Sequence, residues 1–99
     1  LYLYEVFEDN VTPLLRSDFN FTANNFYSAT AAVRDGRLND NSGWAHNQGS
    51  SLVGWTREVG GSRIVYLQFG DGPSAYANPH YRRLIANSIE WVSTKGRPL

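Results

Sequence analysis

Two polar segments of the chain carry the side chains best suited to acid–base chemistry. His46 lies in a stretch rich in Asn, Ser, Gly and Gln between residues 37 and 51, and Asp71 lies in the run Gly70-Asp71-Gly72-Pro73. An imidazole or a carboxylate within hydrogen-bond reach of a hydroxyl or carbonyl group can transfer a proton. Asp71 and His46 are therefore candidate catalytic residues. For Asp71 the alternative is a turn residue that bonds to nearby backbone N–H groups.

Several other kinds of site are excluded by what the chain lacks. It has no Cys, which rules out a thiolate nucleophile and disulfides within these 99 residues. His46 and His80 are too few for a zinc site without added carboxylates, so no metal ion is expected. His80 is interpreted as structural, because it would lie in the first turn of a helix beside two arginines. No P-loop, dinucleotide-binding pattern or Ser-centred nucleophile elbow occurs, so no cofactor is expected.

The segment from Gly70 to Tyr76 has the features of a ligand-binding loop. It connects a predicted strand to a predicted helix, and open α/β sheets bind ligands beyond the carboxyl ends of their strands. Its backbone amides and the helix N-terminus could hold an anion or sugar hydroxyl groups. We expect Gly70 to Pro73, the start of the helix and His46 to line one pocket. The expected ligand-binding residues are Arg57, Gly70, Asp71, Gly72 and Tyr76.

The clearest structural signal is a β-hairpin over residues 52–69. Two runs rich in β-branched and aromatic residues flank Gly60-Gly61, a pair that tolerates positive φ in a two-residue turn. The run from Ile64 to Leu67 is apolar on both faces, which predicts a strand that is covered on both sides.

The first third of the chain predicts two short strands and one short helix. Tyr2 to Phe7 and Val11 to Leu15 have strand-like composition, and Pro13 places the second strand at an edge or margin of a sheet because it lacks an N–H. Asn24-Asn25 offers an N-cap for a helix that Gly36 can close.

A C-terminal helix is predicted over residues 78–94. Asn78 can cap it, and Pro79 suits the first helical position, where its missing N–H costs nothing. Gly96 is expected to follow as a stop signal. One apolar stripe, predicted to face a core, is formed by Tyr81, Leu84, Ile85, Ser88, Ile89 and Val92.

Composition restricts the function classes. The chain is 41% hydrophobic and 14% aromatic, which indicates a folded domain rather than disorder. Nine Lys and Arg residues balance nine Asp and Glu residues, so we expect neither nucleic acid nor an anionic membrane as a partner. No apolar run approaches the roughly 18 residues of a membrane span. The cytoplasm is favoured, although the compartment is not decided.

Five blocks in the second half of the chain follow one another in the order and spacing of a known family. They are Gly54-Trp55-Thr56-Arg57-Glu58-Val59-Gly60, Ser62-Arg63-Ile64-Val65-Tyr66, Gly70-Asp71, Tyr76-Ala77-Asn78-Pro79-His80-Tyr81-Arg82-Arg83-Leu84 and Asn87-Ser88-Ile89-Glu90-Trp91-Val92. This pattern, over about residues 44–93, resembles the C-terminal part of the ThuA-like (trehalose utilisation) family. Asp71 stands where many members carry His.

The resemblance implies a flavodoxin-like, three-layer α/β/α domain of the class I glutamine amidotransferase-like superfamily. Such domains are considerably longer than this chain, so residues 1–99 would form the C-terminal half of a single domain. The absence of Met at position 1 and the apolar opening from Leu1 to Phe7 favour the same interpretation. The resemblance also implies a role in sugar metabolism, with a trehalose-type disaccharide or a derivative as the ligand.

Two functional interpretations remain open. In the first, the strand-end loops bind a carbohydrate-derived ligand, and whether Asp71 or His46 also catalyses a reaction is undecided. The alternative is a non-catalytic structural or interaction half-domain that completes a sheet with a partner chain. In either case a half-domain would leave apolar surface and a strand edge uncovered. We therefore expect it to pair with a missing N-terminal half or to form a homo-oligomer.

Overall fold

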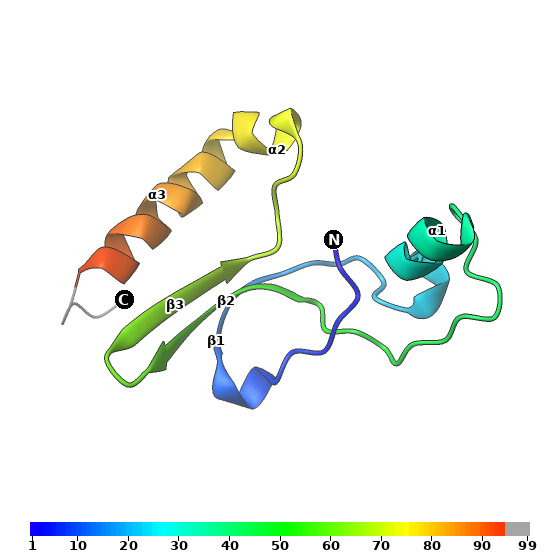
Figure 1. The fold of residues 1–99 in the computed structure, drawn as a ribbon. Coiled ribbons are helices and arrows are strands. Elements are labelled where there is room, and N and C mark those ends of the chain that lie inside the picture. The colour runs from blue at the N-terminus through cyan, green and yellow to red at the C-terminus, as the bar shows by residue number, and fades with distance from the viewer. Residues whose placement is uncertain (95–99) are drawn as a thin grey trace.

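A three-stranded antiparallel sheet organises the chain, and the computed structural model describes residues 1–94 (Figure 1). Strands β1 (Thr12–Arg16), β2 (Leu52–Val59) and β3 (Ser62–Leu67) lie in the order β1-β2-β3, so β2 is paired along both edges. The predicted hairpin is confirmed, with β2 and β3 joined by a two-residue turn. Gly60 takes a φ of 59° in this turn, a left-handed value that glycine adopts without strain.

Strand β1 is an edge strand, as Pro13 predicted. Pro13 lies opposite Trp55 of β2, and the register shifts on both sides of Leu15. At an edge, the missing N–H of proline removes no hydrogen bond that a second neighbouring strand would need. The strand lies one residue further along the chain than the expected run from Val11 to Leu15.

The prediction of a strand from Tyr2 to Phe7 is wrong. The segment is irregular and leads into a short 3-10 helix, η1 (Glu8–Asn10). The ring centre of Tyr4 lies 5.8 Å from that of Tyr66 on β3, and the N–H of Tyr2 donates to Oε1 of Gln68 at 2.8 Å. Tyr4 therefore packs on the sheet instead of joining it as a strand residue. Strand-like composition does not distinguish these two outcomes.

Helix α3 (Pro79–Ser93) confirms the predicted C-terminal helix. The Oδ1 atom of Asn78 caps it, and Pro79 occupies its first turn. The helix ends before Thr94, and the expected stop at Gly96 lies outside the described residues. The apolar stripe is only partly covered: Ile89 is 62% exposed and Val92 is 41% exposed. The expectation that the whole stripe faces a core is wrong, because α3 packs mainly on β3 and α2, and these leave Ile89 and Val92 exposed.

Two shorter helices differ from the sequence expectation. Helix α1 (Ala29–Asp35) starts after Ser28, whose Oγ accepts the N–H of Ala31 at 3.2 Å, so Asn24-Asn25 is not its cap. That pair lies in the 3-10 helix η2 (Ala23–Asn25). Gly36 ends α1 with a φ of 66°, as expected. Helix α2 (Pro73–Ala77) was not expected and occupies the second half of the predicted ligand-binding loop.

The buried core is small and centres on β2. Among residues 1–94, the buried hydrophobic side chains are Phe21, Leu52 and Val53. The prediction that Ile64 to Leu67 is covered on both sides is wrong, because Ile64, on the face opposite Arg63 and α3, is 40% exposed. Strand β2 is more deeply buried, with Leu52, Val53, Gly54 and Thr56 buried.

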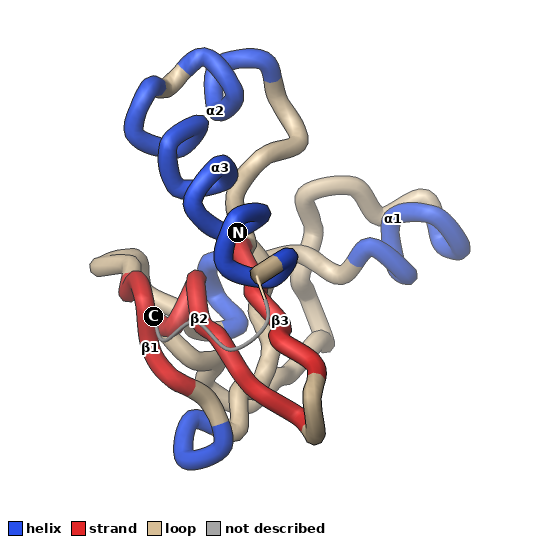
Figure 2. The backbone as a smooth tube through the Cα atoms, turned by 90° about the vertical axis from the view of Figure 1, so that its left-hand side faces the viewer, coloured by secondary structure: helices blue, strands red, loops and turns tan. Residues whose placement is uncertain are grey.

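Helices and a sheet together give the chain a mixed α/β architecture. Figure 2, read with Figure 1, shows α3 on one side of the sheet and α1 well away from it. Both strand pairs are antiparallel. Within the described part of the chain, none of the helices combines the length and apolar character needed to cross a bilayer.

Arg63 joins the C-terminal end of α3 to the hairpin. Its Nη1 donates to the carbonyl oxygens of Trp91 at 3.0 Å and Thr94 at 2.6 Å, and the guanidinium carbon lies 4.9 Å from the indole centre of Trp91. Its Nε donates to Glu58, the residue opposite on β2, at 3.1 Å. The Arg63 side chain is 10% exposed, and the last carbonyls of the helix gain the cation that they favour.

We expect Arg63→Lys to lower the free energy of unfolding by about 1–2 kcal/mol, because an ammonium group cannot reproduce the planar array of bonds. Arg57→Lys is the matched control on the same hairpin, and its exposed side chain should change stability by less than about 0.5 kcal/mol. Urea unfolding followed by tryptophan fluorescence measures both. Equal stability of the two variants would show that apolar packing alone holds α3.

Glu8 connects η1 to β1 and to the loop before β2. Its carboxylate accepts hydrogen bonds from Nη2 of Arg16 and, at 2.8 Å, from Oγ of Ser50. These bonds, that of Arg16 first, lower the pKa of Glu8 below its ordinary value of 4.5. The stabilisation is therefore complete above the unfolded-state pKa and is lost as the pH falls through the lower folded-state pKa.

Glu8→Gln should flatten the acid side of the stability profile, because the amide does not titrate. We expect the loss of urea midpoint between about pH 7 and about pH 3.5 to be smaller in this variant than in the native chain. Paired unfolding curves at the two pH values give the comparison. The same loss in both proteins would contradict a contribution from the Glu8 bonds.

Candidate functional site

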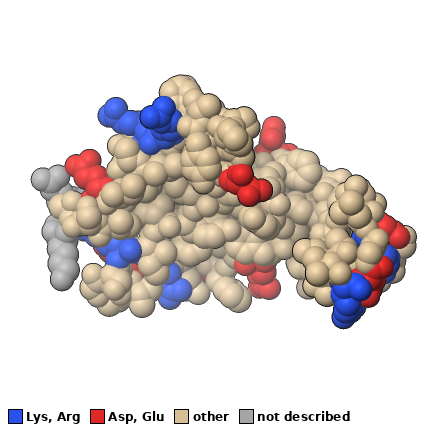
Figure 3. Space-filling model, turned by 45° about the horizontal axis from the view of Figure 1, so that its top comes forward, with Lys and Arg blue, Asp and Glu red and all other residues tan. Residues whose placement is uncertain are grey.

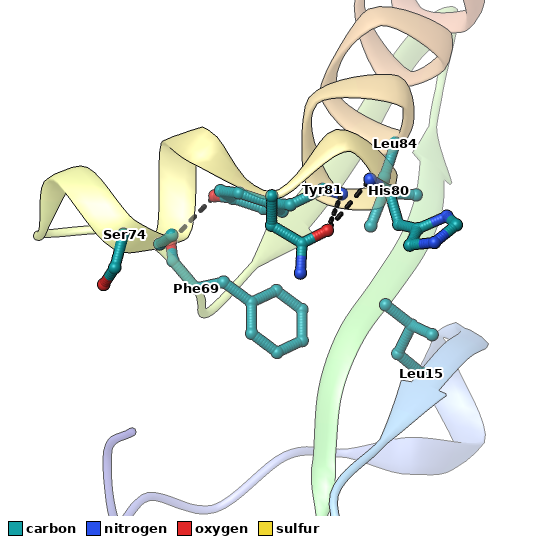
Figure 4. A pocket seen from close by; sticks show the side chains of 8 residues that line it. Leu15, Phe69, Ser74, His80, Tyr81 and Leu84 are labelled. Atoms are coloured by element: carbon teal, nitrogen blue, oxygen red, sulfur yellow. Dashed lines mark hydrogen bonds between the residues drawn. The ribbon is translucent and has the colours of Figure 1, made fainter.

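A cavity of about 560 Å³ lies where the start of α3 faces the sheet (Figure 4). Leu15 of β1, Phe69 from the loop after β3, and Leu84 of α3 provide apolar wall. Polar side chains come from α2 and from the first turn of α3. The full lining is Leu15, Phe69, Ser74, Ala75, Asn78, His80, Tyr81 and Leu84.

Asn78 positions the first turn of α3 and keeps one donor available. Its Oδ1 accepts the N–H groups of His80 at 2.9 Å and Tyr81 at 3.3 Å. The amide orientation is set by these bonds, and Nδ2 has no hydrogen-bond partner within residues 1–94. The imidazole of His80 lies beside Leu15 at the wall of the cavity (Figure 4).

Tyr81 fastens the loop after β3 to α3. Its hydroxyl donates to the carbonyl oxygen of Phe69 at 2.9 Å, and the two rings meet edge to face with centres 5.7 Å apart. Burial, and then the nearby Tyr76 hydroxyl, raises the pKa of Tyr81 above its ordinary value of 10. Tyr81 therefore remains protonated at neutral pH and can keep donating this bond.

A second cavity of about 510 Å³ adjoins the first across the loop after β3. Phe69 and Ala75 line both cavities, so a ligand of two rings could contact both. In this second cavity, the Oε1 atom of Gln68 already accepts a hydrogen bond from the N–H of Tyr2. The full lining is Leu1, Tyr2, Gln68, Phe69, Gly70, Asp71 and Ala75.

The backbone at Gly70 and Asp71 shapes this second cavity. Both residues have positive φ, 125° and 70° respectively. A Cβ at Gly70 would lie 2.7 Å from the hydroxyl oxygen of Tyr76, which only a glycine avoids. The exposed carboxylate of Asp71 has no hydrogen-bond partner within residues 1–94. The alternative in which Asp71 bonds to nearby backbone N–H groups is therefore not the observed arrangement.

His46 does not share either cavity. It lines a third cavity of about 840 Å³ with Leu3, Tyr4, Glu5, Ala45, Asn47 and Gln48. Its Nδ1 lies 2.6 Å from the carbonyl oxygen of Asn47, and its ring centre lies 5.8 Å from that of Trp44. The expectation that His46, the Asp71 loop and the start of α3 line one pocket is thus not met. The loop that carries His46 follows the N-terminal segment instead, through the bond from Ser50 N–H to the Tyr4 carbonyl at 3.1 Å.

The remaining expected ligand-binding residues, Gly72, Tyr76 and Arg57, lie in different parts of the structure. Gly72 lies immediately before α2, as its N-cap residue, and Tyr76 is in α2 with its ring centre 5.7 Å from that of Tyr81. Arg57 is exposed on β2 opposite Ile64 and lines none of the three cavities. Because side chains alternate along a strand, Arg57 lies on the face opposite Thr56, away from the cavity at α3.

Sequence reasoning missed His80, Asn78, Ser74 and Phe69 as cavity residues. The signal for the first two was present: a cap residue and its first-turn neighbours necessarily surround the start of a helix, which was already named as part of the pocket. Within residues 1–94, no three His, Asp or Glu side chains are close enough together to hold a metal ion. In the view of Figure 3, acidic and basic side chains lie in small groups separated by uncharged surface.

Comparison with known proteins gives no match. No protein-family model, no curated protein and no solved structure matches this chain. The function is therefore inferred from the cavity residues, with the sequence resemblance as separate support.

Gly70→Ala should disturb the site, because the added Cβ conflicts with both the positive φ and the Tyr76 hydroxyl. We expect a loss of about 1–3 kcal/mol in the free energy of unfolding and displaced ring resonances of Tyr76 and Tyr81. Gly61→Ala is the control, since nothing lies within 4 Å of a Cβ there and its φ is not left-handed. Urea unfolding and NMR spectra of the tyrosine rings test this, and unmoved ring resonances in Gly70→Ala would contradict the close approach.

Proposed function

We propose that the chain binds a small carbohydrate-derived ligand in the two adjoining cavities after β3. The observation that carries this proposal is the combination of apolar rings and polar groups in two cavities that share Phe69 and Ala75. The first cavity, at about 560 Å³, falls within the range of about 300–1,000 Å³ typical of small-molecule sites.

The lining suits the two kinds of surface on a sugar ring. The C–H faces of a sugar are apolar and can pack against Phe69 and Tyr81. Its hydroxyl groups can accept a hydrogen bond from Nδ2 of Asn78 and donate to the carboxylate of Asp71, neither of which has a hydrogen-bond partner within residues 1–94. His80 can either donate a hydrogen bond to a sugar hydroxyl or accept one from it, because a neutral imidazole has one donor and one acceptor nitrogen.

The proposal concerns binding, and leaves catalysis open. Asp71 is the acid–base candidate that lines the site, whereas His46 lines a separate cavity. The resemblance to the ThuA-like family supports a trehalose-type disaccharide or a derivative as the ligand. It also supports the proposal that the chain is the C-terminal half of a flavodoxin-like, three-layer domain. In that domain the parallel strands would come from the missing N-terminal half, since both strand pairs here are antiparallel.

Trehalose titrated into the ¹⁵N-labelled chain should shift the amides of Phe69, Asp71 and His80. We expect Asp71→Asn and His80→Ala each to weaken binding by about 2- to 10-fold, the value of one hydrogen bond. His46→Ala is the matched control and should leave the dissociation constant unchanged. Saturable shifts centred on His46, or none with trehalose or its phosphorylated and oxidised derivatives, would contradict the proposal.

A second candidate function is that of a non-catalytic half-domain that completes a sheet with a partner chain. The observation that favours it is that much more apolar surface is exposed than is buried in a core. Only three hydrophobic side chains are buried in the described part of the chain, whereas large apolar residues are exposed on both faces of the sheet and along α3. Covering such surface is worth about 25 cal/mol per Å², which gives a partner a substantial driving force.

A further inference from the structure

The two outer edges of the sheet differ in their protection. On β1, Pro13 and two register shifts interrupt the edge, and both are devices by which native sheets prevent further pairing. Strand β3 contains no proline, and its pairing with β2 is regular from Ser62 to Leu67. Arg63 is its only charged residue, and that side chain bonds to Glu58 and to the end of α3. The edge of β3 is therefore open.

The hydrogen-bond pattern identifies the groups on this open edge. The N–H of Gln68 donates to the carbonyl of Val53 at 2.9 Å, so Gln68 points its backbone toward β2. Backbone groups alternate in direction along an antiparallel strand. The N–H and C=O groups of Arg63, Val65 and Leu67 consequently point away from β2, along the open edge.

Helix α3 carries apolar residues past this same edge. Leu84 faces β1, since it lines a cavity with Leu15. At about 100° per residue, Ile89 lies about 140° around the helix from Leu84, and Val92 lies about 80° around in the same direction. Ile89 is 62% exposed and Val92 is 41% exposed, and Ile64 on the other face of β3 is 40% exposed. These three aliphatic residues flank the open edge from both faces.

We propose that the β3 edge docks one extended strand of a partner polypeptide, which adds to the sheet beneath the outer flank of α3. The proposal rests on the second candidate function above and specifies its surface. Main-chain bonds to Val65 and Leu67 would give affinity, and the exposed side chains of Ile64 and Ile89 would contact alternate side chains of the strand. Because the flanking surface is aliphatic, the strand that fits is uncharged and apolar on both faces.

The geometry favours such a strand over a second copy of this chain. Antiparallel pairing of two β3 strands would place both α3 helices on the same face of the joined sheet. Neighbouring strands are about 4.8 Å apart, whereas packed helices need about 8–10 Å between axes. Two α3 helices centred on adjacent β3 strands would therefore collide. A partner strand that carries no helix of its own would fit beside β3, beneath the outer flank of α3.

The test uses the ¹⁵N-labelled chain and a capped synthetic peptide of alternating Val and Ala as the strand probe. We expect the peptide to shift the amides of Val65 and Leu67 and to slow their hydrogen exchange about tenfold or more, with no change at β1. Val65→Pro should abolish this response, because it removes an outward N–H without breaking the ladder to β2. Ile64→Lys provides a second variant that leaves the backbone intact and should weaken binding several-fold.

Val33→Lys is the matched control, because Val33 is 88% exposed on α1, far from the edge, and binding should be unchanged. Peptide shifts confined to β1, or to the cavity around Leu15 and Leu84, would overturn the edge assignment and leave an interaction function standing. If the peptide shifts no residue at all, both the edge assignment and the interaction function are overturned. A dimer of the chain alone, detected by sedimentation and lost in Ile64→Lys, would replace the partner strand with a second copy.

Discussion

The pairing of β2 along both of its edges is the constraint on which the rest of the structure depends. Leu52, Val53 and Thr56 are buried on β2, the strand that has a neighbour along each edge. The strand also sets the position of β3, whose register runs without interruption from the turn at Gly60. The loop after β3 begins where that register ends, so the cavities are located by a ladder of backbone bonds rather than by any one side chain.

Helix α3 is held to this sheet at its two ends by different chemistry. At its start, Asn78 caps the backbone, and Tyr81 bonds to the carbonyl oxygen of Phe69. At its end, Arg63 binds the last carbonyls and stacks on Trp91. Leu84, which lies between these two attachments, lines the cavity together with Leu15.

The proposed ligand-binding site and the open edge lie on different flanks of α3. The flank with Leu84 faces the cavity and β1, whereas Ile89 faces outward past β3. A partner strand at β3 could thus bind without blocking the cavity, and it would bury apolar residues that now face solvent. The two proposed functions are compatible in one molecule, because they use separate surfaces of the same helix.

Local elements were predictable because their signals involve residues close in sequence. Gly60-Gly61 between strand-like runs, Asn78-Pro79 before a helical stripe, Pro13 at an edge and Gly36 after a helix each act within a few residues. The glycine-rich loop after β3 was also recognised as a candidate site, and Gly70, Asp71 and neighbouring Phe69 do line a cavity. Tertiary packing decided the rest. Whether Tyr4 pairs or packs, whether β2 or β3 is covered, and whether His46 meets Asp71 depend on contacts between distant segments, for which the sequence carries no local signal.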